Sequence, residues 1–196
     1  MKAVQIASPV IYWARVRNGA LAVWNGKEEQ IFYRLKGRLI GVYFKSDEWN
    51  GQTFELCLFH IQYQDERWIM SVRVDSQYFR TLCNYLHTCF AEGCHREELT
   101  FAPALTEKDG KKFTAIYVQN GRGNWVRSYF GKGSALPAPL VTQVANKTFY
   151  DWTPVNVYYT TWLKTNFSSG WGDNAETAIV EIVPPPPADD PDDLPF

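Results

Sequence analysis

LKGRLIGVYFKSDEWNGQTFELCLFHIQYQDERWIMSVRV, residues 35–74, is the segment that determines the expected fold of this chain. Short alternating runs over residues 35–45, 52–63 and 67–74 predict three β-strands. Asn50-Gly51 predicts a tight turn between the first two strands, and residues 64–66 predict a turn before the third. We therefore expect an antiparallel meander at the centre of the domain.

Side chains alternate between the two faces of a strand, so the residue order predicts which face is buried. One face of the second and third strands is predicted to form the core: Phe54, Leu56, Leu58, Trp68, Met70, Val72 and Val74. The opposite face is predicted to be an outer surface: Cys57, Phe59, Ile61, Tyr63, Arg67, Ile69, Ser71 and Arg73. A mixed basic and aromatic outer face is typical of a platform on which nucleic-acid bases stack.

Helical periodicity replaces the alternation after the third strand. Apolar residues recur at helical spacing from Phe79 to Phe90, with Asp75-Ser76 as N-terminal caps and Gly93 as a stop. Residues 99–105, 111–119 and 124–130 predict further strands, with a turn at Lys108-Asp109-Gly110 between the first two, and Thr153-Pro154 begins a second helix. The order predicts a mainly β fold: an OB-fold-like small β-barrel with one inserted helix, a C-terminal helix and a disordered acidic tail. Other small barrels and α+β sandwiches share the same order.

Charge is segregated along the chain. Residues 1–172 hold all 20 Lys and Arg against 14 acids, whereas residues 173–196 hold seven acids and no base. A basic body with an acidic end indicates a polyanionic ligand and a tail that competes with it.

Residues 108–132 carry the strongest binding signal in the body, because six bases are interleaved with five aromatic residues and accompanied by one acid, Asp109. Cations neutralise phosphates, and aromatic rings stack on unpaired bases. The predicted DNA-binding residues are Arg38, Lys45, Trp49, Arg67, Arg73, Lys111, Lys112, Tyr117, Arg122, Trp125, Arg127, Tyr129 and Lys132. In a strand, Trp125, Arg127 and Tyr129 would share one face. The structural alternative is that the aromatics pack in the core and the bases protect a sheet edge.

The C-terminal end divides the chain into three parts. Residues 1–167 are the expected binding domain, residues 168–188 a flexible Gly- and Pro-rich linker, and residues 189–196 an acidic tip. The predicted partner-binding residues of the tip are Asp189, Asp190, Asp192, Asp193, Leu194, Pro195 and Phe196. This ending resembles the tip of bacterial and bacteriophage single-stranded DNA-binding proteins, which close with aspartates, an aliphatic residue, proline and a terminal phenylalanine.

The resemblance implies a protein that coats single-stranded DNA during replication, recombination and repair. It also implies that the tip recruits a nuclease, helicase, primase, recombination mediator or polymerase, with the terminal ring in an apolar pocket and basic residues around the carboxylates. The body lacks the long Gly- and Gln-rich linker of the common bacterial proteins, so the chain is more similar to a phage or mobile-element version. The resemblance leaves homo-oligomerisation, and the choice between DNA and RNA, open.

Catalytic motifs are missing from the sequence: there is no G-x-x-x-x-G-K-[ST], H-E-x-x-H or G-x-S-x-G. We therefore expect no enzyme activity, no cofactor and no metal, although the five residues Cys83, His87, Cys89, Cys94 and His95 leave structural zinc as an alternative. No signal peptide or membrane span is evident, so a cytoplasmic protein without membrane contact is expected. A strand-annealing protein with the same tip, or an adaptor that binds no nucleic acid, are the alternative functions.

Overall fold

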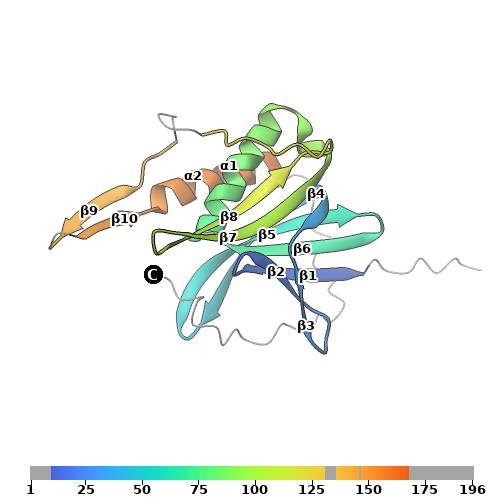
Figure 1. The fold of residues 1–196 in the computed structure, drawn as a ribbon, viewed down its shortest axis with the longest axis horizontal. Coiled ribbons are helices and arrows are strands. Elements are labelled where there is room, and N and C mark those ends of the chain that lie inside the picture. The colour runs from blue at the N-terminus through green and yellow to red at the C-terminus, as the bar shows by residue number, and fades with distance from the viewer. Residues whose placement is uncertain (1–9, 131–135, 146, 168–196) are drawn as a thin grey trace, which may run out of the picture.

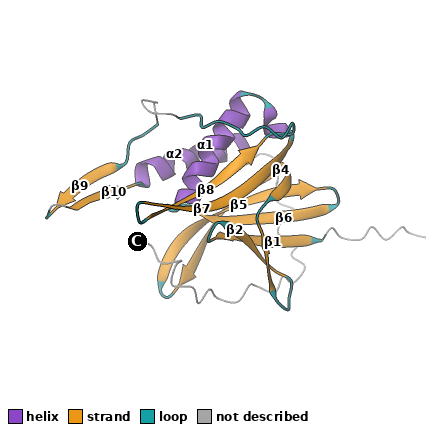
Figure 2. Cartoon of the chain, viewed as in Figure 1, coloured by secondary structure: helices purple, strands orange, loops and turns teal. Residues whose placement is uncertain are grey.

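The computed structural model describes residues 10–130, 136–145 and 147–167, and it is mainly β (Figures 1 and 2). Its strands are β1 (Ile11–Arg17), β2 (Ala20–Trp24), β3 (Glu29–Phe32), β4 (Leu35–Trp49), β5 (Gln52–Tyr63), β6 (Glu66–Arg73), β7 (Glu98–Lys108), β8 (Lys111–Gln119), β9 (Leu140–Val144) and β10 (Lys147–Asp151). Two helices, α1 (Gln77–Ala91) and α2 (Thr153–Phe167), and the short 3-10 helix η1 (Cys94–Arg96) complete the fold.

Eight of the strands form one curled sheet in the order β3-β2-β1-β6-β5-β4-β7-β8 (Figure 1). All neighbouring pairs are antiparallel except β1 and β6, which run parallel. The predicted meander is confirmed as β4-β5-β6, and the predicted strands at residues 99–105 and 111–119 are confirmed as β7 and β8. The sheet extends beyond the prediction at its N-terminal side, where β1, β2 and β3 were not expected.

Tight two-residue turns close three of the hairpins. Both turn residues have positive φ at Asn18-Gly19 (47° and 75°), Asn50-Gly51 (51° and 74°) and Asp109-Gly110 (53° and 70°). Asn, Asp and Gly tolerate this left-handed region, and two consecutive positive φ angles match the right-handed twist of the flanking strands. The Asn50-Gly51 and Asp109-Gly110 turns were predicted from the sequence.

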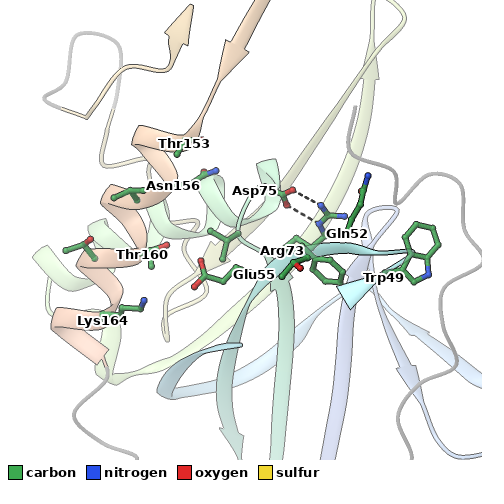
Figure 3. A pocket seen from close by; sticks show the side chains of 14 residues that line it. Trp49, Gln52, Glu55, Arg73, Asp75, Thr153, Asn156, Thr160 and Lys164 are labelled. Carbon is green, nitrogen blue, oxygen red and sulfur yellow. Dashed lines mark hydrogen bonds and ion pairs between the residues drawn. The ribbon is translucent and has the colours of Figure 1, made fainter. Parts of the chain in front are cut away.

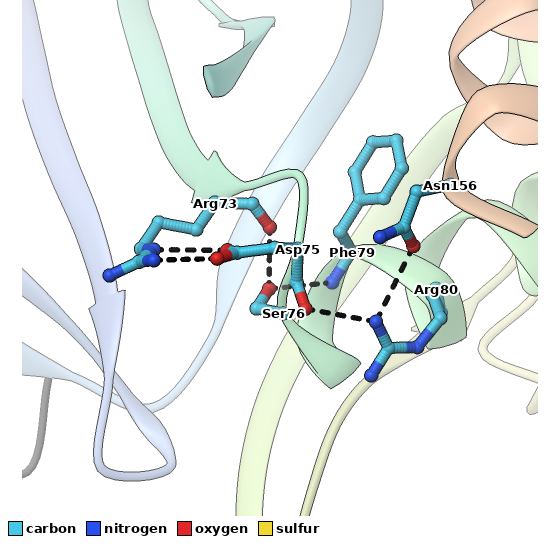
Figure 4. Close-up of polar contacts among 6 residues, drawn as sticks. All are labelled: Arg73, Asp75, Ser76, Phe79, Arg80 and Asn156. Atoms are coloured by element: carbon cyan, nitrogen blue, oxygen red, sulfur yellow. Dashed lines mark hydrogen bonds and ion pairs between the residues drawn. The ribbon is translucent and has the colours of Figure 1, made fainter. Parts of the chain in front are cut away.

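Helix α1 begins where the sequence predicts. The hydroxyl of Ser76 accepts a hydrogen bond from the backbone N–H of Phe79 at 3.2 Å (Figure 4). Gly93, with φ of 75°, follows the last turn. The helix also covers the free edge of β8. Gln77 Oε1 accepts from the N–H of Thr114 at 3.2 Å, and Thr81 Oγ1 accepts from the N–H of Ile116 at 3.1 Å. The backbone N–H groups of Thr114 and Ile116, which could otherwise pair with another β-strand, therefore have acceptors within the domain.

The core lies between the helices and one face of the curled sheet, which we call the inner face. Phe79, Leu82 and Leu86 of α1 are fully buried there with Tyr159 and Leu163 of α2. From the sheet, the inner face contributes Ala14, Leu21, Val23, Leu35, Leu39, Val42, Cys57, Phe59, Ile61, Met70, Val72, Leu99, Phe101, Ile116 and Val118. None of the helices in the described ranges is long and apolar enough to span a lipid bilayer.

The predicted inner and outer faces are correct for β6 and wrong for β5. Phe59 pairs with Met70, and Cys57 pairs with Val72, so these residues of β5 share the buried face of β6. Phe59, Cys57 and Ile61 are 0% exposed, although they were predicted to face outward. The expected strand at residues 124–130 is also wrong, since this segment is a loop that touches β8 through one isolated bridge between Gln119 and Trp125.

Candidate nucleic-acid interface

The opposite side of the eight-stranded sheet, which we call the outer face, is defined by the strand register. Residues paired across a ladder point to the same side of the sheet. Ile69 of β6 pairs with Trp13 of β1 and His60 of β5, which places all three on the outer face, and the same rule assigns the remaining strands.

Aromatic and basic side chains dominate this face. Seven aromatic residues lie on it: Trp13, Trp24, Tyr43, Trp49, Phe54, Phe113 and Tyr117. Nine bases lie on it: Arg15, Arg17, Lys36, Arg38, Lys45, Arg67, Arg73, Lys108 and Lys111. Three acids accompany them: Glu29, Asp47 and Glu98. The face is therefore strongly cationic, and the net charge of the whole chain conceals it.

Several of these rings are open to solvent. Tyr43 is 61% exposed, Phe113 is 44% exposed and Tyr117 is 39% exposed. Four others, Trp13, Trp24, Trp49 and Phe54, are half-buried. Exposed aromatic rings on a cationic sheet are what an unpaired base requires for stacking.

Ion pairs neutralise part of the outer-face charge. Arg73 donates two hydrogen bonds to Asp75, from Nε at 3.0 Å and from Nη2 at 2.6 Å (Figure 4). Its guanidinium lies 5.0 Å from the centroid of the Phe54 ring. Lys36 pairs with Glu98 at 3.0 Å, which raises the pKa of the lysine, and Arg17 pairs with Glu29. Lys45 and Lys111 are exposed and form no ion pair within the described ranges. Arg38 and Lys108 are likewise exposed on the outer face without an ion pair in the described part of the chain, so these four bases are the accessible cations for a phosphate.

The loop after β8 brings two predicted residues together. Trp125, 52% exposed, packs its ring at 6.1 Å from that of Tyr117. The N–H of Val126 donates to the carbonyl of Val118 at 2.8 Å, which fixes the loop against the edge of β8. Arg122 lies at the exposed turn of this loop and Arg127 is also exposed.

Tyr129 departs from the predicted arrangement with Trp125 and Arg127. Its ring lies 5.4 Å from that of His87 and 4.9 Å from that of Phe130, on the helical side of the molecule. Asn84 of α1 holds this segment in a non-strand conformation, because its amide accepts from the N–H of Phe130 at 2.8 Å and donates to Ser128 Oγ at 2.6 Å. Side-chain hydrogen bonds from α1 thus replace the strand ladder.

A groove of about 780 Å³ borders the outer face between the β4-β5 hairpin, the β6-α1 turn and α2 (Figure 3). Trp49, Phe54 and Arg73 line it from the sheet, and Asn156 and Lys164 line it from α2. Trp49, Phe54 and Arg73 belong both to the outer face and to the groove, so the two surfaces are continuous.

The cysteines and histidines of the suggested zinc cluster have other surroundings. Cys83 and Cys89 are fully buried in α1, and desolvation raises the pKa of both thiols. His87 packs against aromatic rings, and burial lowers its pKa to about 4. Within the described ranges, His, Cys, Asp and Glu side chains form no group of three or more that would hold a metal ion.

The structure places the other predicted residues as follows. Arg38, Lys45, Trp49, Arg67 and Arg73 lie on the outer face together with Lys111 and Tyr117, whereas Lys112 points to the inner side of β8. Lys132 and the seven residues of the tip lie outside the described residues. Other outer-face residues were not predicted from the sequence, among them Trp13, Arg15, Trp24 and Tyr43. Trp13, Arg15 and Arg17 alternate just before the turn residues Asn18-Gly19, as in a strand that leads into a hairpin turn. Trp13 and Arg15 could have been predicted from this pattern.

Comparisons with known proteins give no relative for this chain: no family model, no curated protein and no solved structure matches it.

Proposed function

We propose that the chain binds single-stranded DNA across its outer face. The observation that carries the proposal is the coincidence of nine bases, three acids and seven aromatic rings on one side of one sheet. Phosphates bind the cations, and unpaired bases stack on rings such as Tyr43 and Tyr117. Duplex DNA hides its base faces within the helix, so the rings favour a single strand.

The curled sheet supports an OB-fold-like mode of binding, in which the DNA strand crosses a barrel surface and contacts the connecting loops. In this proposal the exposed loop with Arg122 and Trp125 extends the platform beside Tyr117. The groove beside Trp49 and Phe54 continues it toward α2.

The second part of the proposal concerns the acidic tip, which we infer to recruit DNA-processing proteins. Its support is the sequence: four aspartates, Asp189, Asp190, Asp192 and Asp193, followed by Leu194, Pro195 and the aromatic ring of Phe196. A basic pocket on a partner would bind the carboxylates and bury the ring.

Quenching of intrinsic Trp fluorescence by an unlabelled oligo-dT tests the binding proposal, since the chain has eight Trp residues. We expect salt-sensitive quenching by the single strand and weaker quenching by a duplex of equal length. A version that ends at Ala188 serves as the control for the tail. Absence of binding at low salt in both versions would overturn the proposal and leave an adaptor. Faster annealing of complementary strands would instead favour the strand-annealing alternative.

A further inference from the structure

A two-stranded hairpin, β9-β10, projects from the body and is separate from the eight-stranded sheet (Figure 1). All ten of its strand residues are exposed. Five of them are large and apolar, with exposed fractions of 54–60%: Leu140, Val141, Val144, Phe149 and Tyr150. We call this hairpin the arm.

The arm presents apolar groups on both of its faces. The register places Leu140, Val144 and Phe149 on one face and Val141 and Tyr150 on the other. A two-stranded hairpin is marginally stable in water, and a long exposed apolar surface marks an interaction site. The arm therefore gains stability when another sheet or chain covers it.

The root of the arm is firmly attached to the domain. Asp151 Oδ1 accepts a hydrogen bond from the N–H of Thr153 at 2.9 Å, at the start of α2. The guanidinium of Arg80 lies 4.7 Å from the centroid of the Trp152 ring, which in turn stacks at 6.3 Å from Tyr150. These contacts fix the direction of the arm where it joins α2.

The charges of β10 indicate what covers it. The strand reads Lys147-Thr148-Phe149-Tyr150-Asp151, with opposite charges at equal distances from its centre. Antiparallel pairing of two identical β10 strands about Phe149 places each Lys147 opposite the Asp151 of the other copy. Lys147 has no ion-pair partner within the described ranges, since its cross-strand neighbour is Val144.

We propose that the arm is a self-association site, in which two copies of the chain pair their β10 strands about a two-fold axis at Phe149. In the resulting four-stranded sheet, β10 of one arm pairs with β10 of the other arm. A nucleic acid is a poorer occupant, because the arm carries one base and one acid and thus no net attraction for phosphates. The inference is independent of the proposed DNA binding.

Charge reversal tests the register directly. In Lys147→Glu, both inter-copy pairs become Glu opposite Asp, and in Asp151→Lys both become Lys opposite Lys. We expect each variant alone to dimerise roughly tenfold more weakly or worse in sedimentation velocity. An equimolar mixture restores two attractive pairs, because each Lys147→Glu chain then pairs with an Asp151→Lys chain and both contacts join opposite charges. We expect the dimer to return in this mixture.

Matched charge reversals in another hairpin provide the control. Lys27→Glu and Glu28→Lys change exposed charges in the β2-β3 turn and should leave the dimer unaffected, alone or mixed. A wild-type chain that stays monomeric at high micromolar concentration would overturn the proposal. So would a mixture of the two arm variants that stays monomeric, or single variants that dimerise as well as wild type.

A second measurement covers the case in which Asp151→Lys unfolds because α2 loses its cap. The two-fold axis places residue 149 opposite itself, within the Cβ distance that a disulfide needs. Phe149→Cys should form an inter-chain disulfide under mild oxidation. Val157→Cys, on the exposed side of α2, should not. Equal cross-linking of the two variants would contradict the proposed pairing.

Discussion

The imidazole of His87 stacks on the indole of Trp162, with 3.7 Å between ring centroids and 21° between planes. Phe130 and Tyr158 also approach His87, at 4.9 and 5.7 Å, so the histidine joins α1, α2 and the loop after β8. Its Nε2 atom has no hydrogen-bond partner within the described ranges. This apolar site therefore favours the neutral imidazole.

Acid should destabilise the fold through His87. Burial lowers the pKa of His87 to about 4, below its usual value of 6.5, so the unfolded chain binds the proton more readily. The stabilisation is complete above pH 6.5 and decreases as the pH falls toward 4, by about 3 kcal/mol at most. Urea unfolding at pH 7.5 and 5.0 should show this loss in wild type and a smaller loss in His87→Phe. Equal losses in the two proteins would contradict the assignment, since all other groups are shared.

Turn chemistry made much of the sheet predictable. Asn50-Gly51 and Asp109-Gly110 favour positive φ in two consecutive residues, and the structure has tight turns at both places. Asn18-Gly19 carries the same signal, and the strands β1 and β2 on either side of it could have been predicted from it. Helix α1 was predictable because a cap, a helical apolar period and a glycine stop agree.

Two parts of the site depend on tertiary contacts that the sequence does not encode locally. In β5 both faces are apolar, so alternation cannot decide which one is buried, and the pairing of Phe59 with Met70 decides it. Residues 124–130 alternate like a strand, yet Asn84 and Thr88 of α1 bind their backbone instead. The outer face itself becomes visible only when the register of all eight strands is known.

Asn84 should stabilise the loop that carries Trp125. Its side chain accepts from the N–H of Phe130 and donates to Ser128 Oγ and the carbonyl of Phe130. Asn84→Ala leaves the N–H of Phe130 without its acceptor, whereas Ser128 Oγ still donates to the carbonyl of Phe130. We expect a loss of about 1–3 kcal/mol in the free energy of unfolding. We also expect faster amide exchange at Phe130. Thr165→Ala removes an exposed hydroxyl that bonds within α2 and should cost less. A similar loss in both variants would show that Asn84 has no special role.

Tyr43 should contribute to single-strand binding by stacking. The side chain is 61% exposed on the outer face, and one stacked base contributes about 1–3 kcal/mol. Tyr43→Ala should therefore weaken oligo-dT binding roughly 5- to 150-fold with little effect on Tm. Tyr33→Ala is the control, because Tyr33 is 71% exposed but lies between β3 and β4, outside the strand register. Equal effects of the two substitutions would argue against the outer face as the binding surface.

Lys45 should contribute one phosphate contact, which the salt dependence of binding measures. The side chain is exposed on the outer face, and its cross-strand neighbour is the apolar Leu56. The charge of Lys45 is therefore available to a phosphate of single-stranded DNA. Each neutralised phosphate of a single strand changes the slope of log K against log salt by about 0.7. Lys45→Gln should reduce the steepness of that slope by about this amount, whereas Lys27→Gln, in the β2-β3 turn, should leave the slope unchanged. The slope is more informative than a single affinity, because loss of folding lowers affinity without a defined change in slope. An unchanged slope in Lys45→Gln would indicate that single-stranded DNA binds elsewhere on the molecule.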